Sequence, residues 1–358
     1  MSAVADPEGL LVVRLGAMGD ILHTLPAVTA LRNALPNARI GWIVEERWAE
    51  LLCAKTTSRS GPRVPSRPLL DFVHTVNTKA WRKSLLSRET RRQISSALRE
   101  VRELKYDIAV DFQGALKSAV IARAAGARAV VGLERPRETP ARLLYGRRVA
   151  TTKVHVVEQY HSLAEAVAEK TLPVPAVDLP RDNEAEADIA KKLADIGEVK
   201  DFAIITPGAG WGAKQWPPER YGAVAGALAN DGLTPLINCG PGEEGLAQAV
   251  QAASNGKSHL ISCSIGELIA LTRRARLFIG GDTGPLHLAA ALRVPVVAIF
   301  GPTDPARNGP FGTKSIVLRN AASRPSLSHV GEPDPGLLQI TAEEVISASR
   351  RLLEEPHA

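Results

Sequence analysis

The amino-acid sequence predicts two doubly wound α/β domains, and three observations lead to this expectation. The chain has 358 residues, which is too long for one typical core and fits two domains. Short apolar runs alternate with helix-like runs in both halves, as they do in parallel sheets covered by helices. Glycine-containing polar loops follow several apolar runs, which places them at the ligand edge of such sheets.

In the first half, repeated strand–loop–helix units give the order of elements. Strands are expected at 10–15, 39–44, 72–76, 107–111 and 129–132, and helices at 21–35, 85–104 and 115–125. The stretch 54–68 contains four basic residues, three prolines and no acidic residue, so we expect a mobile loop there.

The second half restarts the same pattern after a proline-rich, extended segment at 172–184. Strands are expected at 202–206, 234–238, 259–262, 277–279 and 294–300, and helices at 218–230, 243–253, 265–274 and 289–292. The expected domains are therefore 1–180 and 181–358. A final amphipathic helix at 342–353 can pack back on the first domain.

Composition points to a soluble cytosolic protein. Hydrophobic residues make up 45% and charged residues 23% of the chain, and no apolar run approaches a membrane span. Residues 1–8 carry acidic and no basic side chains, unlike a secretory signal. The three cysteines, Cys53, Cys239 and Cys263, are far apart, which argues for reduced thiols and against a disulfide framework or a zinc site.

Positive charge is concentrated in the first half. The windows 79–105 and 123–153 together carry a net charge of +12. Because the whole chain carries +6, the remaining residues have a net charge of −6. This asymmetry predicts an anionic partner, namely a nucleic acid, a lipid headgroup layer or an acidic substrate. For the stretch 88–105 alone, a solvated helix face is the better explanation. The cluster 79–83 follows a strand end and is harder to explain in that way.

The stretch 281–288, Gly-Asp-Thr-Gly-Pro-Leu-His-Leu, carries the most information about function. It joins a buried strand to a helix, so backbone N–H groups and the positive end of a helix dipole meet Asp282, Thr283 and His287. A second strand, at 294–300, ends in Gly-Pro-Thr-Asp-Pro. We expect a phosphorylated ligand at this edge, although an isolated Asp-Thr-Gly would more often cap a helix.

Three further loops carry candidate site residues. Lys214 follows a loop with three glycines, where backbone can approach a phosphate and the lysine adds a point charge. Glu243 follows another strand end and could hold a ribose diol, with helix capping as the alternative. Asp20 ends Gly-Ala-Met-Gly-Asp at the mouth of the first strand, where it is either a proton acceptor or a helix cap. That spacing differs from the dinucleotide fingerprint.

Taken together, six ordered motifs resemble the bacterial lipopolysaccharide heptosyltransferases over essentially the whole chain. They lie at 14–26, 106–118, 155–158, 214–217, 282–288 and 301–305. The stretches 44–46, 81–83 and 137–138 look most like heptosyltransferase I, which adds the first heptose to Kdo-lipid A. Two departures stand out: the family's Thr-Thr pair is replaced by Ala209-Gly210, and its Ser before Met-Gly-Asp is Ala17.

The resemblance implies a GT-B glycosyltransferase whose two Rossmann-like domains face a cleft, with ADP-heptose in the second domain and no metal or other cofactor. It implies Asp20 as general base and Lys214 as a catalytic diphosphate contact. Implied donor contacts are Gly19, Gly208, Gly210, Glu243, Asp282, Thr283, Gly284 and His287. Implied acceptor contacts are Lys79, Arg82, Lys83, Gln113, Lys117, Arg135 and Arg137.

The implied reaction is an inverting transfer of heptose from ADP-L-glycero-D-manno-heptose to Kdo of Kdo-lipid A, in lipopolysaccharide inner-core biosynthesis. We expect a monomer in the cytoplasm, peripheral on the inner membrane and without a nucleic-acid partner. Alternatives are heptosyltransferase II, another sugar transferase of the family, a nucleotide-sugar epimerase, or a non-catalytic binder of anions or nucleic acid. Few aromatic residues, 4% of the chain, argue against the last.

Overall fold

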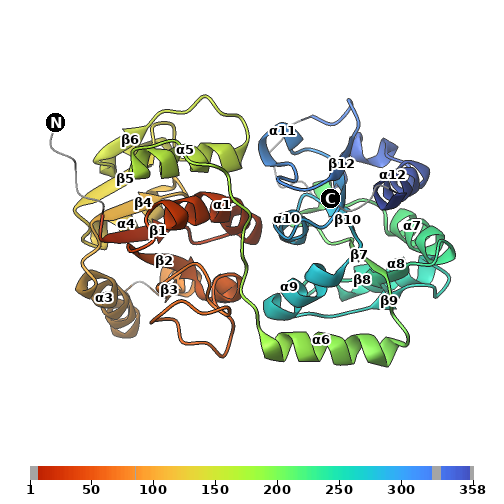
Figure 1. Cartoon of the computed structure of the whole chain (residues 1–358). Coiled ribbons are helices and arrows are strands. Elements are labelled where there is room, and N and C mark those ends of the chain that lie inside the picture. Colours follow the sequence, from red (N-terminus) through yellow and green to blue (C-terminus); the bar gives the residue numbers. More distant parts are fainter. Residues whose placement is uncertain (1–6, 85, 325–331, 355–358) are drawn as a thin grey trace. The chain divides into compact units, whose positions relative to one another are not determined.

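The computed structural model describes residues 7–84, 86–324 and 332–354 and divides into two compact units. Unit 1 runs to Arg181 and unit 2 starts at Asp182. Figure 1 labels most of the helices and strands of both units. Each unit contains one sheet of six strands in which all neighbours are parallel.

The sheet of unit 1 has the strand order β3-β2-β1-β4-β5-β6. Its strands are β1 (Gly9–Val13), β2 (Arg39–Glu45), β3 (Phe72–Val76), β4 (Ile108–Asp111), β5 (Ala129–Leu133) and β6 (Arg147–Val149). Its α-helices are α1 (Met18–Ala34), α2 (Thr78–Lys83), α3 (Arg88–Glu103), α4 (Leu116–Ala124) and α5 (Val156–Ala168). The strand order reverses between β1 and β4, so the loops after these two strands form the edge where open sheets bind ligands.

The sheet of unit 2 has the order β12-β11-β10-β7-β8-β9, which is the same topology counted from β7. Its strands are β7 (Phe202–Thr206), β8 (Thr234–Ile237), β9 (His259–Leu260), β10 (Leu277–Gly281), β11 (Val296–Phe300) and β12 (Ser315–Arg319). Its α-helices are α6 (Asn183–Ile196), α7 (Pro218–Asn230), α8 (Glu244–Ala253), α9 (Ile265–Arg274), α10 (Gly284–Ala291), α11 (Pro305–Asn308) and α12 (Ala342–Glu354). Here the order reverses between β7 and β10. The predicted pair of doubly wound parallel sheets is confirmed.

Continuous apolar sequence makes the central strands. Every residue of β1 (GLLVV), β7 (FAIIT), β10 (LFIGG) and β11 (VVAIF) is buried. Strands that are buried on both faces need helices on both faces, which is why these runs do not alternate with polar residues. The weak strands were missed: β6 is a short charged strand and β12 a half-exposed one, and both lie at sheet edges.

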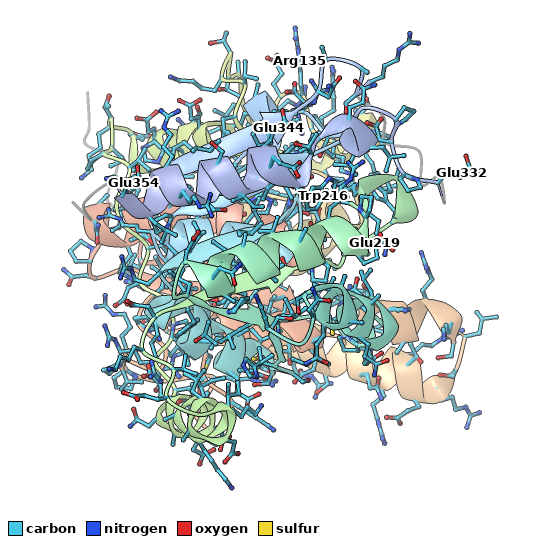
Figure 2. All side chains as sticks on the ribbon, turned by 90° about the vertical axis from the view of Figure 1, so that its right-hand side faces the viewer. Arg135, Trp216, Glu219, Glu332, Glu344 and Glu354 are labelled. Carbon is cyan, nitrogen blue, oxygen red and sulfur yellow. The ribbon has the colours of Figure 1, made fainter. Side chains whose placement is uncertain are left out.

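The C-terminal helix α12 packs in unit 2. Its buried residues Val345, Ala348 and Leu352 belong to the core cluster that also contains the buried face of α7. Figure 2 shows α12, with Glu344 and Glu354 near its two ends, lying alongside α7. The apolar face that could have packed back on the first domain is therefore used within unit 2.

The expected helix at 85–104 is confirmed as α3, and the sequence did not predict the short helix α2 that precedes it. Asn77 caps α2 by accepting from the backbone N–H of Ala80, and Ser87 caps α3 by accepting from Thr90. Each of these two capping residues starts its own helix.

The stretch 54–68 forms a defined loop around the buried guanidinium of Arg67, which argues against the mobile loop expected from its composition. Arg67 is 1% exposed. Its Nε donates to the carbonyl of Leu70, and its two terminal nitrogens donate to the carbonyls of Ser58, Gly61 and Pro62. A charged donor set that satisfies several buried carbonyls holds the loop closed.

Replacing Arg67 with methionine should lower the free energy of unfolding by about 3 kcal/mol, because the buried carbonyls would lose a charged donor. Urea unfolding followed by tryptophan fluorescence measures the change. The matched control is Arg63→Met in the same loop, where the arginine side chain is 40% exposed and 3.9 Å from Asp71. It should cost less than about 1 kcal/mol. Equal losses would mean that Arg67 does not organise the loop.

Candidate functional site

The centre of unit 2's ligand edge is an ion cluster of Lys214, Asp282 and His287. Lys214 Nζ lies 2.6 Å from Asp282 Oδ2 and 3.3 Å from the Asp282 carbonyl oxygen. His287 Nε2 lies 3.0 Å from Asp282 Oδ1. The Asp282 side chain is only 9% exposed, and those of Lys214 and His287 are 16% and 5% exposed. Lys214 ends the loop after β7, whereas Asp282 and His287 follow β10, so the strand reversal brings them together.

The cluster keeps Asp282 ionised. Burial by itself would raise the pKa of Asp282, but the hydrogen bond and charge of His287 and the ammonium of Lys214 outweigh it and hold that pKa well below its usual range. Lys214 also lies over the Trp211 ring, 5.2 Å from its centroid. The lysine is therefore held between a carboxylate and an aromatic face, with its position fixed.

Asp282 should contribute stability that is present above its unfolded pKa of about 3.8 and is lost as the pH falls towards the lower folded value. We expect Asp282→Asn to be less stable than the native chain at pH 7 by about 3 kcal/mol, since Lys214 then lacks its buried partner. Below pH ~4 the difference should shrink. Urea unfolding across this pH range measures it, and a difference independent of pH would contradict the prediction.

Neither Asp282 nor Thr283 caps helix α10. Thr283 stands at the N-cap position, but its hydroxyl donates to the Gly281 carbonyl oxygen at 3.3 Å and makes no cap hydrogen bond. The carboxylate of Asp282 is used by Lys214 and His287. The simpler helix-cap interpretation is therefore wrong, and at the start of α10 Gly284 has a backbone N–H whereas Pro285 has none.

Two buried hydroxyls at the same edge were not singled out from the sequence. Thr206 at the end of β7 is 4% exposed and Thr303, in the loop after β11, is 7% exposed. Within the described residues, neither hydroxyl has a hydrogen-bond partner. Buried hydroxyls normally have one, so both are candidates for ligand contact. For Thr303, the sequence indicated a site residue, because Thr303 lies in the polar loop Gly-Pro-Thr-Asp-Pro that follows a buried strand.

Glu243 lies against the glycines of the loop after β7. A Cβ placed on Gly208 would come within 2.1 Å of Glu243 Oε2, so a side chain at this position would have to displace the carboxylate. The same oxygen accepts from the backbone N–H of Gly240 at 2.9 Å. Gly210 faces open space, since no atom lies within 4 Å of the Cβ it would carry. Gly284 is the first residue of α10. These predicted residues thus gather at one edge of unit 2.

Asp20 lies in the first turn of α1, at the ligand edge of unit 1. Asp20 Oδ1 is 2.6 Å from Nη2 of Arg14, and Oδ2 accepts from the backbone N–H of Ala17 at 3.1 Å. Its side chain is 37% exposed, whereas that of Arg14 is 4% exposed. Asp20 therefore accepts one hydrogen bond from the backbone at the start of α1, and part of its carboxylate is still exposed. Gly19 precedes it in the same turn.

Arg14 was missed as the partner of Asp20. Its Nη1 donates to the Phe112 carbonyl at 2.8 Å, and its guanidinium lies 5.3 Å from the Tyr160 ring centroid. Burial alone would lower the pKa of Arg14, but Tyr160, Asp20 and Asp111 raise it above its ordinary value. A permanent positive charge therefore orients Asp20. The single arginine in the first apolar run was the available signal.

Gln113 follows β4 and contacts the segment that carries the Asp20 site, whereas Lys117 lies in the first turn of α4. Gln113 Oε1 accepts from the backbone N–H of Leu15 at 2.9 Å, and Lys117 Nζ donates to Thr78 Oγ1 at 2.8 Å. Asp111 holds the loop by accepting from the N–H groups of Gln113 and Gly114. Burial raises the pKa of Asp111, although four hydrogen bonds oppose the shift.

The other predicted acceptor residues are exposed and come from two separate segments. Lys79, Arg82 and Lys83 lie on α2 after β3, and Arg135 and Arg137 lie in the loop after β5. Asp20 and all of these residues belong to unit 1, whereas the Lys214 cluster belongs to unit 2.

Within residues 7–84, 86–324 and 332–354, no three His, Cys, Asp or Glu side chains gather as metal ligands would. In the same residues, no helix has the length and hydropathy needed to span a bilayer.

Comparison with known proteins adds a family and its members. The model of glycosyltransferase family 9 (heptosyltransferase) matches residues 94–333. Lipopolysaccharide heptosyltransferase 1 of Pseudomonas aeruginosa is 30% identical over 314 residues, covering 86% of this chain and 83% of that protein. Lipopolysaccharide heptosyltransferase 3 of Escherichia coli is 26% identical over 363 residues, covering 94% and 96%. An E. coli heptosyltransferase solved with ADP has a TM-score of 0.76 at 25% identity, covering 96% of this chain and 99% of its own.

Proposed function

Because the chain belongs to glycosyltransferase family 9, the heptosyltransferases, we propose that it transfers heptose from ADP-L-glycero-D-manno-heptose to the Kdo sugar of Kdo-lipid A. The observation that carries the proposal is the Lys214–Asp282–His287 cluster beside the uncapped start of α10. This arrangement suits a diphosphate, since it offers a held ammonium group next to free backbone donors.

The departing ADP gains negative charge on its diphosphate as the bond to heptose breaks. Lys214 and the first N–H groups of α10 would stabilise that charge, each contact contributing about 3 kcal/mol in the transition state. With these donors we propose that the reaction uses no metal. The Glu243 carboxylate, beside Gly208 and Gly240, would accept from the ribose hydroxyls. The backbone near Ala209 and Gly210 would replace the hydroxyl contacts of the family's Thr-Thr pair.

Asp20 would remove the proton from the attacking hydroxyl of the acceptor. Arg14 and the Ala17 N–H hold the carboxylate in one orientation, and the partly exposed oxygen edge can reach a bound hydroxyl. The oxygen of that hydroxyl bonds to the anomeric carbon as the bond to ADP breaks on the opposite side. The transfer would therefore invert the anomeric configuration in one displacement.

The exposed cations of unit 1 would bind the carboxylates and phosphates of the acceptor. Arginine suits bidentate carboxylate contacts, which fits Arg82, Arg135 and Arg137, while Lys79 and Lys83 add point charges. Such an acceptor is a membrane lipid, so we propose a monomer that works in the cytoplasm at the surface of the inner membrane. The relatives named lipopolysaccharide heptosyltransferase 1 favour an acceptor without heptose over one that already carries the first heptose.

The purified full chain with ADP-heptose and detergent-dispersed acceptors tests the proposal. We expect heptose on Kdo-lipid A, no product on an acceptor that already carries the first heptose, an inverted anomeric centre by NMR, and an unchanged rate in EDTA. Transfer only to the heptosylated acceptor would favour a later step of the pathway. Conversion of ADP-heptose without any acceptor would favour an epimerase and overturn the proposal.

A further inference from the structure

Helix α3 presents one face that consists almost entirely of arginine. At 3.6 residues per turn, five arginines fall within a stripe of roughly 100° around the helix axis. They are Arg88, Arg91, Arg92, Arg99 and Arg102, and all five are exposed. The opposite face holds the residues that attach the helix: Thr90 and Val101 are buried, and Ile94, Ala97 and Leu98 are half-buried. The helix therefore turns its arginines outward.

The helix lies at a margin of unit 1. It packs beside β3, an edge strand of the sheet, as Figure 1 shows. Three acidic residues share the helix with the five arginines: Glu100 is bound to His74 at 3.0 Å, Glu89 pairs with Arg92 at 2.7 Å, and Glu103 is exposed. The remaining guanidinium groups form a row of positive charge on an exposed helix, which attracts extended anionic surfaces.

An exposed leucine precedes this stripe. Leu86 is 84% exposed, and its sequence neighbours Arg82, Lys83 and Arg88 are exposed as well. A large apolar side chain among basic residues is typical of segments that lie on anionic membranes. Proteins that bind single-stranded nucleic acid typically add exposed aromatic rings to such a basic surface. The only aromatic residue between 78 and 103 is Trp81, which is half-buried and donates to Gln93 at 3.2 Å.

We propose that the arginine face of α3, together with Leu86, docks unit 1 on a bilayer of anionic phospholipids. This contact is separate from the acceptor residues of α2 and the loop after β5, because it needs only headgroup charge and no acceptor sugar. The proposal rests on the proposed function in one respect: docking on a membrane is useful to the enzyme only if its acceptor is a lipid. Docking would raise the local concentration of enzyme around the acceptor without changing chemistry at Asp20 or Lys214.

Cosedimentation with vesicles that lack the acceptor tests the proposal. We expect the full chain to bind vesicles of equal parts phosphatidylglycerol and phosphatidylcholine, to bind pure phosphatidylcholine weakly, and to be released by salt. The triple variant Arg91→Ser, Arg92→Ser and Arg99→Ser should bind the anionic vesicles about a hundredfold more weakly, at roughly fivefold for each arginine. Leu86→Ser should weaken binding several-fold.

The matched control removes the same charge from exposed positions of unit 2, with Lys191→Ser, Lys200→Ser and Arg351→Ser. It should bind vesicles nearly as tightly as the native chain. Equal losses in the two triple variants would overturn the proposal, because net charge alone would then explain binding. Binding of RNA or DNA but not of vesicles, lost in the α3 variant, would assign the stripe to nucleic acid instead.

A second measurement separates this proposal from the function. With detergent-dispersed acceptor, the α3 triple variant should transfer sugar at the native rate, whereas with acceptor embedded in anionic vesicles its rate at low enzyme concentration should fall. Circular dichroism confirms that the variant is folded. Absence of transfer by the native chain in detergent would count against the proposed function, and vesicle binding would still decide the role of α3. A loss of rate in detergent equal to that on vesicles would place the arginines in catalysis and contradict docking.

Discussion

Replacing Asp20 with asparagine should lower the turnover number for sugar transfer by at least about a hundredfold while ADP binding stays unchanged. The amide keeps an oxygen that can accept from the Ala17 N–H, so the first turn of α1 stays capped. What it loses is the basic carboxylate and the ion pair with Arg14. Initial rates with saturating substrates, together with ADP titration by calorimetry, measure the two quantities.

The control for Asp20 is another change of carboxylate to amide, Asp195→Asn, at an exposed position of α6. Its rate should equal that of the native chain. If Asp20→Asn retained full activity, Asp20 would serve only as a helix cap and the partner of Arg14. If the variant lost activity and also unfolded at lower urea, the loss would be structural and the assignment as a base would fail.

Replacing Lys214 with methionine should lower turnover by about a hundredfold to a thousandfold and weaken ADP binding as well. The reason is that the ammonium group would be missing where the diphosphate gains charge. Lys214→Arg should recover part of the activity, since the positive charge returns with a different shape. Steady-state kinetics with ADP-heptose and product inhibition by ADP measure both effects.

Unit 2 offers a matched control for Lys214. Lys192 also pairs with a carboxylate at 2.6 Å, that of Glu267, and it lies on α6, away from the loops after β7 and β10. Lys192→Met should keep its turnover. Equal losses in the two variants would show that breaking any such ion pair impairs unit 2, and the role of Lys214 in the diphosphate site would be withdrawn.

Most of the fold could be predicted because buried parallel strands are continuous apolar runs. The runs at 10–15, 202–206 and 294–300 correspond to the central strands β1, β7 and β11. Strands with little apolar content could not be predicted in this way. One example is β6, which has the sequence Arg-Arg-Val and is not buried. The loop at 54–68 was misjudged because its prolines and basic residues suggest solvent, whereas Arg67 turns inward and supplies the donors that the backbone lacks.

For the site, the sequence predicted which loops matter but not how their side chains pair. Lys214 and Asp282 were both selected, from loops 68 residues apart, yet nothing local indicates that they form an ion pair. The same limit hid Arg14, whose contacts with Asp20 and Phe112 depend on neighbouring strands. Thr206 could be recognised only once burial was known, because an unsatisfied hydroxyl in a strand has no sequence signature, whereas Thr303 lies in a motif that the sequence already indicated.

Because α12 completes the core of unit 2, the two units can fold one after the other during synthesis on the ribosome. Trp216 and Arg220 both donate to the carbonyl of Ile340, and α12 then completes the core against β10, β11 and α7. Unit 1 needs nothing beyond Arg181 for its own sheet, and domains fold as units during synthesis. A nascent chain can thus fold unit 1 early, while the unit that carries Lys214 and Asp282 is completed only after α12 has been synthesised.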